Sequence, residues 1–196
     1  MKSSGLWFVL TGLAIAGLAA FGPPEKTLGA NVRIVYLHGA WVWTSLICLG
    51  LAALVGAAGL LRRSASLLRW SRSLGRTGVL FWVAYLPLSM WASQANWNGL
   101  YLAEPRWRVA FIFAVTGLLL QIGLALLERP AWTAAANLLY FLALAYALAT
   151  AERVMHPPSP IFSSDSLRIQ FFFIALVALT LLLAGLVARG WQRFER

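Results

Sequence analysis

The strongest constraint on this chain is a series of six apolar stretches separated by short polar connections. Each stretch is close to the roughly 20 residues that a helix needs to cross the hydrocarbon core of a bilayer, or reaches that length with its flanks. Hydrophobic residues fill 61% of the 196 positions and charged residues only 11%, which is more apolar surface than a soluble domain can cover. We therefore predict an all-α, polytopic membrane helix bundle of about six transmembrane helices, forming one integral membrane domain over residues 1–196. The stretches are Leu6–Phe21, Ala40–Leu61, Gly78–Ser93, Val109–Leu127, Ala131–Thr150 and Ile169–Val187.

The distribution of lysine and arginine predicts that both termini lie in the cytoplasm, because cytoplasmic loops carry the excess of these residues. The segment Arg62–Arg76 has five arginines and no acidic residue, so we predict a short amphipathic helix lying on the anionic inner leaflet. With the N-terminus inside, the inner set is Lys2, Arg62, Arg63, Arg69, Arg72, Arg76, Arg129, Arg189, Arg193 and Arg196. The smaller outer set is Lys26, Arg33, Arg106, Arg108, Arg153 and Arg168.

Composition disfavours several other classes of protein. The formal net charge is +10, but the basic residues fall in short connections, which is typical of membrane orientation rather than of nucleic-acid binding. Cys48 is the only cysteine, so neither an internal disulfide nor a CxxC pair can form. Met1–Ala20 has a basic start and an apolar core, so a cleaved signal peptide stays open as an alternative. Cleavage would leave five helices and an outside N-terminus.

The two histidines of the chain, His38 and His156, both fall on the predicted outer face. A lone histidine at a membrane boundary is more often an interfacial hydrogen-bonding residue, but here two of them flank an aromatic connection. Neutral imidazole is a good axial ligand for haem iron, and a bis-histidine haem b needs one imidazole on each side of the ring. The haem propionates would need cations, and Arg33, Arg106 and Arg108 could supply guanidinium partners. No HExxH or comparable zinc-ligand spacing accompanies these histidines.

Tryptophan is abundant, with ten residues in the chain. Amphipathic rings at the headgroup level form an aromatic belt, and this is the interpretation we adopt for Trp82 and Trp132. Trp97 and Trp107 lie in a connection that also carries arginines, so a flat platform for a planar, apolar, dianionic ligand is an equal alternative to a belt.

Three further residues complete the predicted haem site. Trp41 follows His38 closely, Tyr101 lies between the two tryptophans of the connection, and Glu104 could orient a guanidinium or an imidazole. The helices lack buried acidic residues, which disfavours a proton or ion pathway. The predicted cofactor-binding set is His38, His156, Trp97, Tyr101, Trp107, Arg33, Arg106, Arg108, Glu104 and Trp41, with the two histidines as the metal ligands.

The run Arg33–His38, followed by Ala40 and Trp41, resembles the segment that enters the second helix of the cytochrome c assembly family. Members of that family carry a loop with a Trp-Trp-x-Trp-Asp-x-Arg signature between two outer-face histidines, and both histidines ligate haem. The matching stretch here reads LYLAEPR. In it Glu104 replaces the aspartate, Arg106 keeps the basic position and Tyr101 is the one aromatic residue that remains. The chain is thus similar to a divergent member with a degenerate tryptophan-rich loop.

This resemblance implies a haem-handling protein in the bacterial plasma membrane, with haem b held at the outer, periplasmic face for presentation or relay. The implied partners are an ABC-type complex and a haem chaperone, beside the lipid bilayer itself, and the chain need not be an enzyme. Two other hypotheses stay open. One is a bis-histidine haem b electron-transfer subunit of a respiratory complex, and the other is a structural subunit that has lost haem.

Overall fold

A computed structural model describes residues 2–154, 161–162 and 164–194 of the chain. In this part of the chain the regular structure is helical, and the one extended pairing is an isolated bridge between Glu25 and Gly29. The all-α prediction is therefore confirmed. The six helices are α1 (Lys2–Ala20), α2 (Val32–Leu61), α3 (Ala65–Trp97), α4 (Pro105–Leu127), α5 (Pro130–Thr150) and α6 (Leu167–Phe194).

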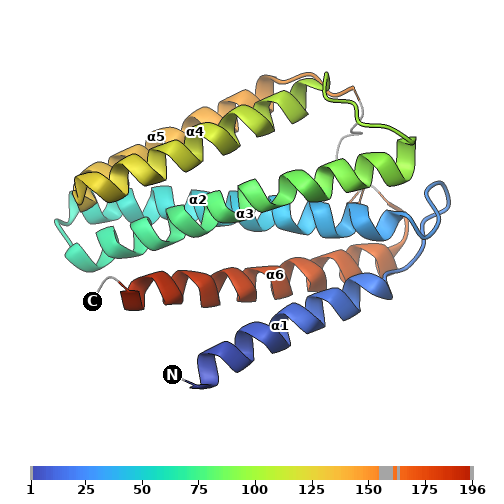
Figure 1. Cartoon of the computed structure of the whole chain (residues 1–196), viewed down its shortest axis with the longest axis horizontal. Helices are drawn as coiled ribbons and strands as arrows, with labels where there is room; N and C mark the ends of the chain where they lie inside the picture. Colours follow the sequence, from blue (N-terminus) through green and yellow to red (C-terminus); the bar gives the residue numbers. More distant parts are fainter. Residues whose placement is uncertain (1, 155–160, 163, 195–196) are drawn as a thin grey trace.

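The helices run up and down in three layers, with α2 and α3 between the α4–α5 pair and the α1–α6 pair (Figure 1). Helix α2 is central and contacts α1, α3, α5 and α6. Since consecutive helices alternate in direction, α1 begins and α6 ends at the same end of the bundle (Figure 1). We call this the terminal end; it also carries the α2–α3 and α4–α5 turns. The opposite end, which we call the loop end, carries the other three connections.

Four of the described helices, α2, α4, α5 and α6, are long and apolar enough to cross a membrane. Their outward faces carry large apolar side chains, such as Leu126 at 81% exposure and Leu139 at 67%. Exposed apolar surface of this extent is suited to lipid rather than to water. Helix α1 contributes a shorter apolar segment, Gly5–Ala20. The architecture is therefore that of a helical membrane bundle.

Helix α2 begins eight residues earlier than its apolar stretch, at Val32 rather than Ala40. Arg33 and His38, expected in a connection, are thus helical residues. A contact from a distant segment stabilises this start, because the Asn31 side chain donates to the Ala95 backbone oxygen at the end of α3 (2.9 Å). The Tyr36 hydroxyl also donates to the Pro23 oxygen (3.2 Å). Hydropathy does not detect such contacts, so the predicted start of α2 came too late in the sequence.

The prediction of a separate surface helix over Arg62–Arg76 is wrong. A short turn ends at Ser64, whose hydroxyl accepts from the Leu67 N–H (3.5 Å), and α3 then runs without a break to Trp97. Ser71 is buried against α2 and donates to the Ala52 oxygen (2.8 Å). The start of α3 is therefore packed into the bundle, with arginines on its outer side.

Asn137 of α5 connects three helices in the interior of the bundle. Its Nδ2 donates to the Ser71 oxygen of α3 (2.9 Å), and its Oδ1 accepts from Gln121 Nε2 of α4 (3.0 Å). A Cβ at Gly75 would lie 2.6 Å from the Asn137 amide, so only glycine allows this close approach. Interhelical hydrogen bonds of this kind contribute about 0.6–2 kcal/mol each in membranes. This network fixes α4 and α5 against α3 in the half of the bundle nearer the terminal end.

Candidate functional site

The loop end of the bundle contains a cavity of about 540 Å³. This volume lies within the range of about 300–1,000 Å³ that is typical of small-molecule and cofactor sites. Its walls come from the α1–α2 connection, from α2 and α3, from the α3–α4 connection with the start of α4, and from the segment that enters α6. The predicted site residues in the wall are His38, Trp97, Tyr101, Glu104 and Trp107, and the other lining residues include Glu25, Tyr36, Ser89, Ser93, Ile161 and Ser164.

His38 lies in the second turn of α2 and is half-buried. Its ring is edge-on to that of Tyr85 on α3, with the ring centroids 5.5 Å apart and the planes at 61°. Tyr85 in turn packs edge-on against Trp82 (4.8 Å, 73°), whose indole N–H donates to the Ala110 oxygen of α4 (3.0 Å). A series of buried rings therefore supports the imidazole. Trp82 is only 1% exposed, so the prediction that it belongs to an aromatic belt is wrong. Trp132, the other residue assigned to the belt, is 66% exposed.

The connection between α3 and α4 is shorter than expected, because α3 includes Trp97 and α4 begins at Pro105. Proline fits the first turn of a helix, where its missing N–H costs nothing. The first turn of α4 therefore holds Trp107 in the cavity wall, where it stacks on Phe111 (5.5 Å, 9°). The Trp107 Nε1 atom is buried and has no hydrogen-bond partner among the described residues. This donor is available to a ligand.

Trp97 and Tyr101 are nearly half exposed, at 46% and 47%, whereas Glu104 is 2% exposed. The two rings therefore belong to the outer part of the cavity wall and Glu104 to its inner part. Ser93 donates from its hydroxyl to the Gly99 oxygen (2.7 Å) and so holds the connection against the last turns of α3. The three lining residues Ser89, Ser93 and Trp97 recur every four positions, a spacing that puts them on one face of a helix. This spacing was the sequence signal that could have identified the two serines.

Glu25 was not anticipated by the sequence, yet it contributes a carboxylate to the cavity wall. The carboxylate accepts from the backbone N–H groups of Leu28 (3.0 Å) and Thr27 (2.8 Å). These bonds lower the pKa of Glu25 below its ordinary value. Gly29, with φ at +57°, lets the chain turn back so that its backbone pairs with Glu25. The loop geometry therefore depends on Gly29, and apolar patterns carry no signal for it.

The three arginines predicted to pair with propionates make other contacts or face outward, and among the described residues no arginine or lysine lines the cavity. Arg33 donates from Nε to the Gly22 oxygen (3.0 Å), and Arg106 donates from an Nη atom to the Leu148 oxygen near the end of α5 (3.0 Å). Arg108 is exposed. Trp41 packs on Phe81 in the core (5.4 Å). Pairing of the arginines with propionates stays a prediction.

His156, the second predicted ligand, lies outside the described residues. Ile161 and Ser164, which follow it in the chain, line the cavity. The described part of the chain contains no group of three or more histidine, cysteine, aspartate or glutamate side chains placed to hold a metal ion.

Comparison with known proteins adds no relative to this picture. No family model, no curated protein and no solved structure matches the chain. The resemblance to the cytochrome c assembly family therefore rests on the residues named above and stays a prediction.

Proposed function

We propose that this chain is a haem-handling membrane protein of the cytochrome c assembly type, which holds haem b in the cavity at the loop end. The observation that carries the proposal is His38 in the wall of a cofactor-sized cavity lined by Tyr36, Trp97, Tyr101 and Trp107. His38 would be one axial ligand, and His156 would be the other.

The cavity suits the apolar, planar part of haem better than its charged edge. Aromatic walls favour the binding of a flat ring. A neutral imidazole is a good axial ligand for ferric or ferrous haem iron. The buried Nε1 donor of Trp107 could satisfy one polar group of the ligand. The wall carries the carboxylates of Glu25 and Glu104 but no described arginine. The propionates would therefore lie at the mouth of the cavity.

The same proposal places the loop end outside the cytoplasm of a bacterial cell, with the cavity at the outer face of the plasma membrane. Charge supports this orientation, because the terminal end carries eight described arginines (Arg62, Arg63, Arg69, Arg72, Arg76, Arg129, Arg189 and Arg193) and one described acidic residue, Glu128. The loop end carries six basic residues and four acidic ones (Glu25, Glu104, Glu152 and Asp165). An arginine excess is typical of the cytoplasmic side. An ABC-type complex and a haem chaperone are the partners we propose.

The carboxylates in the cavity wall favour a second candidate, a structural subunit that keeps this architecture without haem. Two acidic residues and no described arginine or lysine line the cavity. Although Arg106 interacts electrostatically with Glu104, this lining disfavours a dianionic ligand through like-charge repulsion. In that case the cavity would hold lipid or an uncharged molecule.

A transfer assay separates these possibilities. The purified protein would be loaded with haem and mixed with apomyoglobin, and the transfer of haem would be followed by absorption. A handling protein releases haem to the acceptor, an electron-transfer subunit retains it at full stoichiometry, and a structural subunit never acquires it. Retention of haem would contradict the handling function, and failure to load would contradict both haem functions.

A further inference from the structure

The wall of the cavity at the loop end carries negative charge. Glu25 and Glu104 line it, and no arginine or lysine of the described chain does. Arg106 interacts electrostatically with Glu104, so part of the charge of this carboxylate is compensated. Lys26, which follows Glu25 in the chain, is exposed and does not line the cavity. Glu25 is therefore the carboxylate whose charge is available to a ligand.

The Glu25 carboxylate is both ionised and held in place. One of its oxygens, Oε2, accepts from the N–H groups of Leu28 (3.0 Å) and Thr27 (2.8 Å). These bonds lower the pKa of Glu25, so the group is charged at neutral pH. Backbone amides carry no net charge, so they fix the carboxylate without neutralising it. A carboxylate has about four acceptor positions on its two oxygens, which leaves Oε1 to interact with a ligand.

Aromatic rings from several elements meet at the same cavity, and they are Tyr36, Trp97, Tyr101 and Trp107. The Tyr36 hydroxyl donates to the Pro23 oxygen (3.2 Å), which joins the Tyr36 side chain to the α1–α2 connection. The Asn31 side chain donates to the Ala95 oxygen (2.9 Å), which joins the other end of this connection to α3, two residues before Trp97. The connection that carries the carboxylate is therefore packed against the elements that carry the rings. The faces of tyrosine and tryptophan rings attract organic cations.

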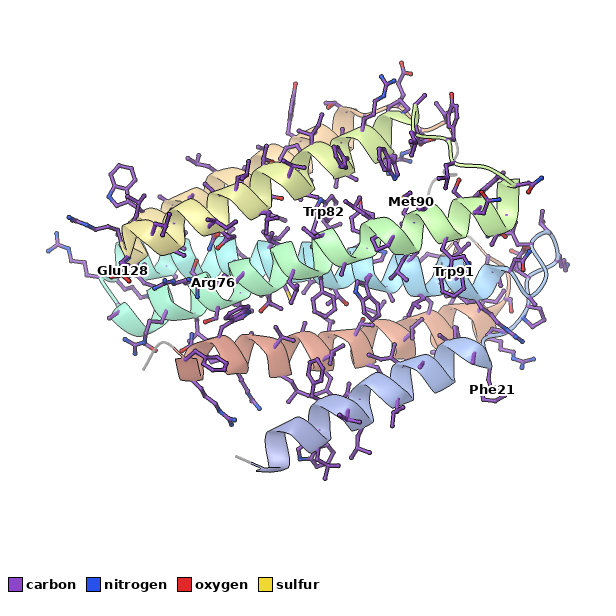
Figure 2. All side chains as sticks on the ribbon, in the orientation of Figure 1. Phe21, Arg76, Trp82, Met90, Trp91 and Glu128 are labelled. Atoms are coloured by element: carbon purple, nitrogen blue, oxygen red, sulfur yellow. The ribbon has the colours of Figure 1, made fainter. Side chains whose placement is uncertain are left out.

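The position of the cavity favours a ligand that partitions into the membrane surface. The exposed rings of Phe21 and Trp91 lie toward the loop end, whereas Glu128 lies toward the opposite end (Figure 2). Tryptophan is favoured at the level of the lipid headgroups, so the loop end lies at a surface of the bilayer. Apolar side chains, among them Val32 and Ile169, complete the cavity wall and suit the apolar body of such a ligand.

We propose that the cavity at the loop end binds a lipophilic organic cation, which is an ammonium or similar onium group attached to an apolar body. The cationic group would lie at the Glu25 carboxylate, and the apolar body would lie among the four rings. Charge attraction and cation–π contact would then act on the same group. This inference does not depend on haem binding, and the cation and haem would exclude each other from the cavity.

A pair of ions with nearly the same shape and opposite charge tests the proposal. Equilibrium dialysis of the full chain in an uncharged detergent would measure the binding of tetraphenylphosphonium and of tetraphenylborate, with the detergent alone as the blank. We expect saturable binding of the cation and much weaker binding of the anion. E25Q keeps an oxygen acceptor for the two N–H groups but removes the charge, so it should weaken cation binding roughly fivefold. W97L should weaken it roughly two- to fivefold.

The matched control is E152Q, because Glu152 is an exposed acidic residue at the same end that does not line the cavity. This variant should bind the cation as the wild type does. Equal losses in E25Q and E152Q would overturn a site at Glu25 in favour of general charge attraction. Equal binding of the two ions by the wild type, or unchanged cation binding in E25Q, would overturn cation recognition. Haem binding is measured separately by absorption, so a failure of this proposal is distinguishable from a failure of the haem proposal.

Discussion

The imidazole of His38 on α2 rests edge-on against the ring of Tyr85 on α3, with ring centroids 5.5 Å apart. Tyr85 is 5% exposed and packs in turn on the fully buried Trp82. The predicted haem ligand is therefore supported by the core of the bundle rather than by a loop. A ligand preorganised in this way loses less conformational freedom when it binds a metal.

Removing the Tyr85 ring should weaken haem binding without removing the ligand itself. An edge-to-face aromatic pair contributes about 0.5–1.5 kcal/mol, so Y85L should raise the haem dissociation constant roughly 2- to 10-fold. Y85F keeps the ring and serves as the control. Haem titration followed by absorption measures both variants, and equal affinities for Y85L and Y85F would show that the ring contact does not position His38.

Asn137 should be important for stability, because N137A leaves the Ser71 oxygen and the Gln121 amide without their partner. Loss of one partner from a buried hydrogen bond costs about 1–3 kcal/mol. We expect the free energy of unfolding in detergent to fall by that amount in a denaturant titration. Thr116 is exposed and bonds only within its own helix, so T116A should change the stability little. A stability loss in T116A as large as that in N137A would contradict the importance of the network.

Two glycines give a matched test of helix packing. A Cβ at Gly75 would lie 2.6 Å from the Asn137 amide, whereas one at Gly123 would meet nothing within 4 Å. G75A should destabilise the protein by about 1–3 kcal/mol through overpacking, and G123A should be neutral or slightly stabilising because alanine favours a helix. Thermal unfolding in detergent measures both. A stable G75A protein would mean that α5 shifts away from α3 without cost.

The α1–α2 connection should loosen in acid. The N–H groups of Leu28 and Thr27 donate to the Glu25 carboxylate and lower its pKa, so ionised Glu25 stabilises the folded loop. This contribution is fully present above the unfolded pKa of about 4.3 and is lost as the pH falls through the lower folded pKa. Amide hydrogen exchange at these two residues, corrected for the intrinsic pH dependence of exchange, should show falling protection in acid. E25Q should remove this dependence, and a wild type with constant protection over the same range would contradict it.

The sequence predicted six helices from six apolar stretches, but it did not predict where α2 and α3 begin. The start of α2 depends on Asn31 reaching Ala95, 64 residues away, and the start of α3 depends on Ser71 packing against α2. Neither contact leaves a trace in local hydropathy. The cavity was predictable in outline, since the odd-numbered connections of an up-and-down bundle meet at one end and bring His38 near the Trp97–Trp107 segment. The contact of Arg106 with the Leu148 oxygen could not be predicted, because it joins the start of α4 to the end of α5 across 42 residues.

Absorption spectra of the purified protein with added haem, oxidised and reduced, test whether His38 and His156 ligate haem iron. The wild type should give a low-spin b-type spectrum, and H38A and H156A should each weaken it or turn it high-spin. W132A changes an exposed ring outside the cavity and should match the wild type. A wild-type protein that stays colourless after haem is added, or an H38A spectrum identical to that of the wild type, would contradict haem ligation by His38.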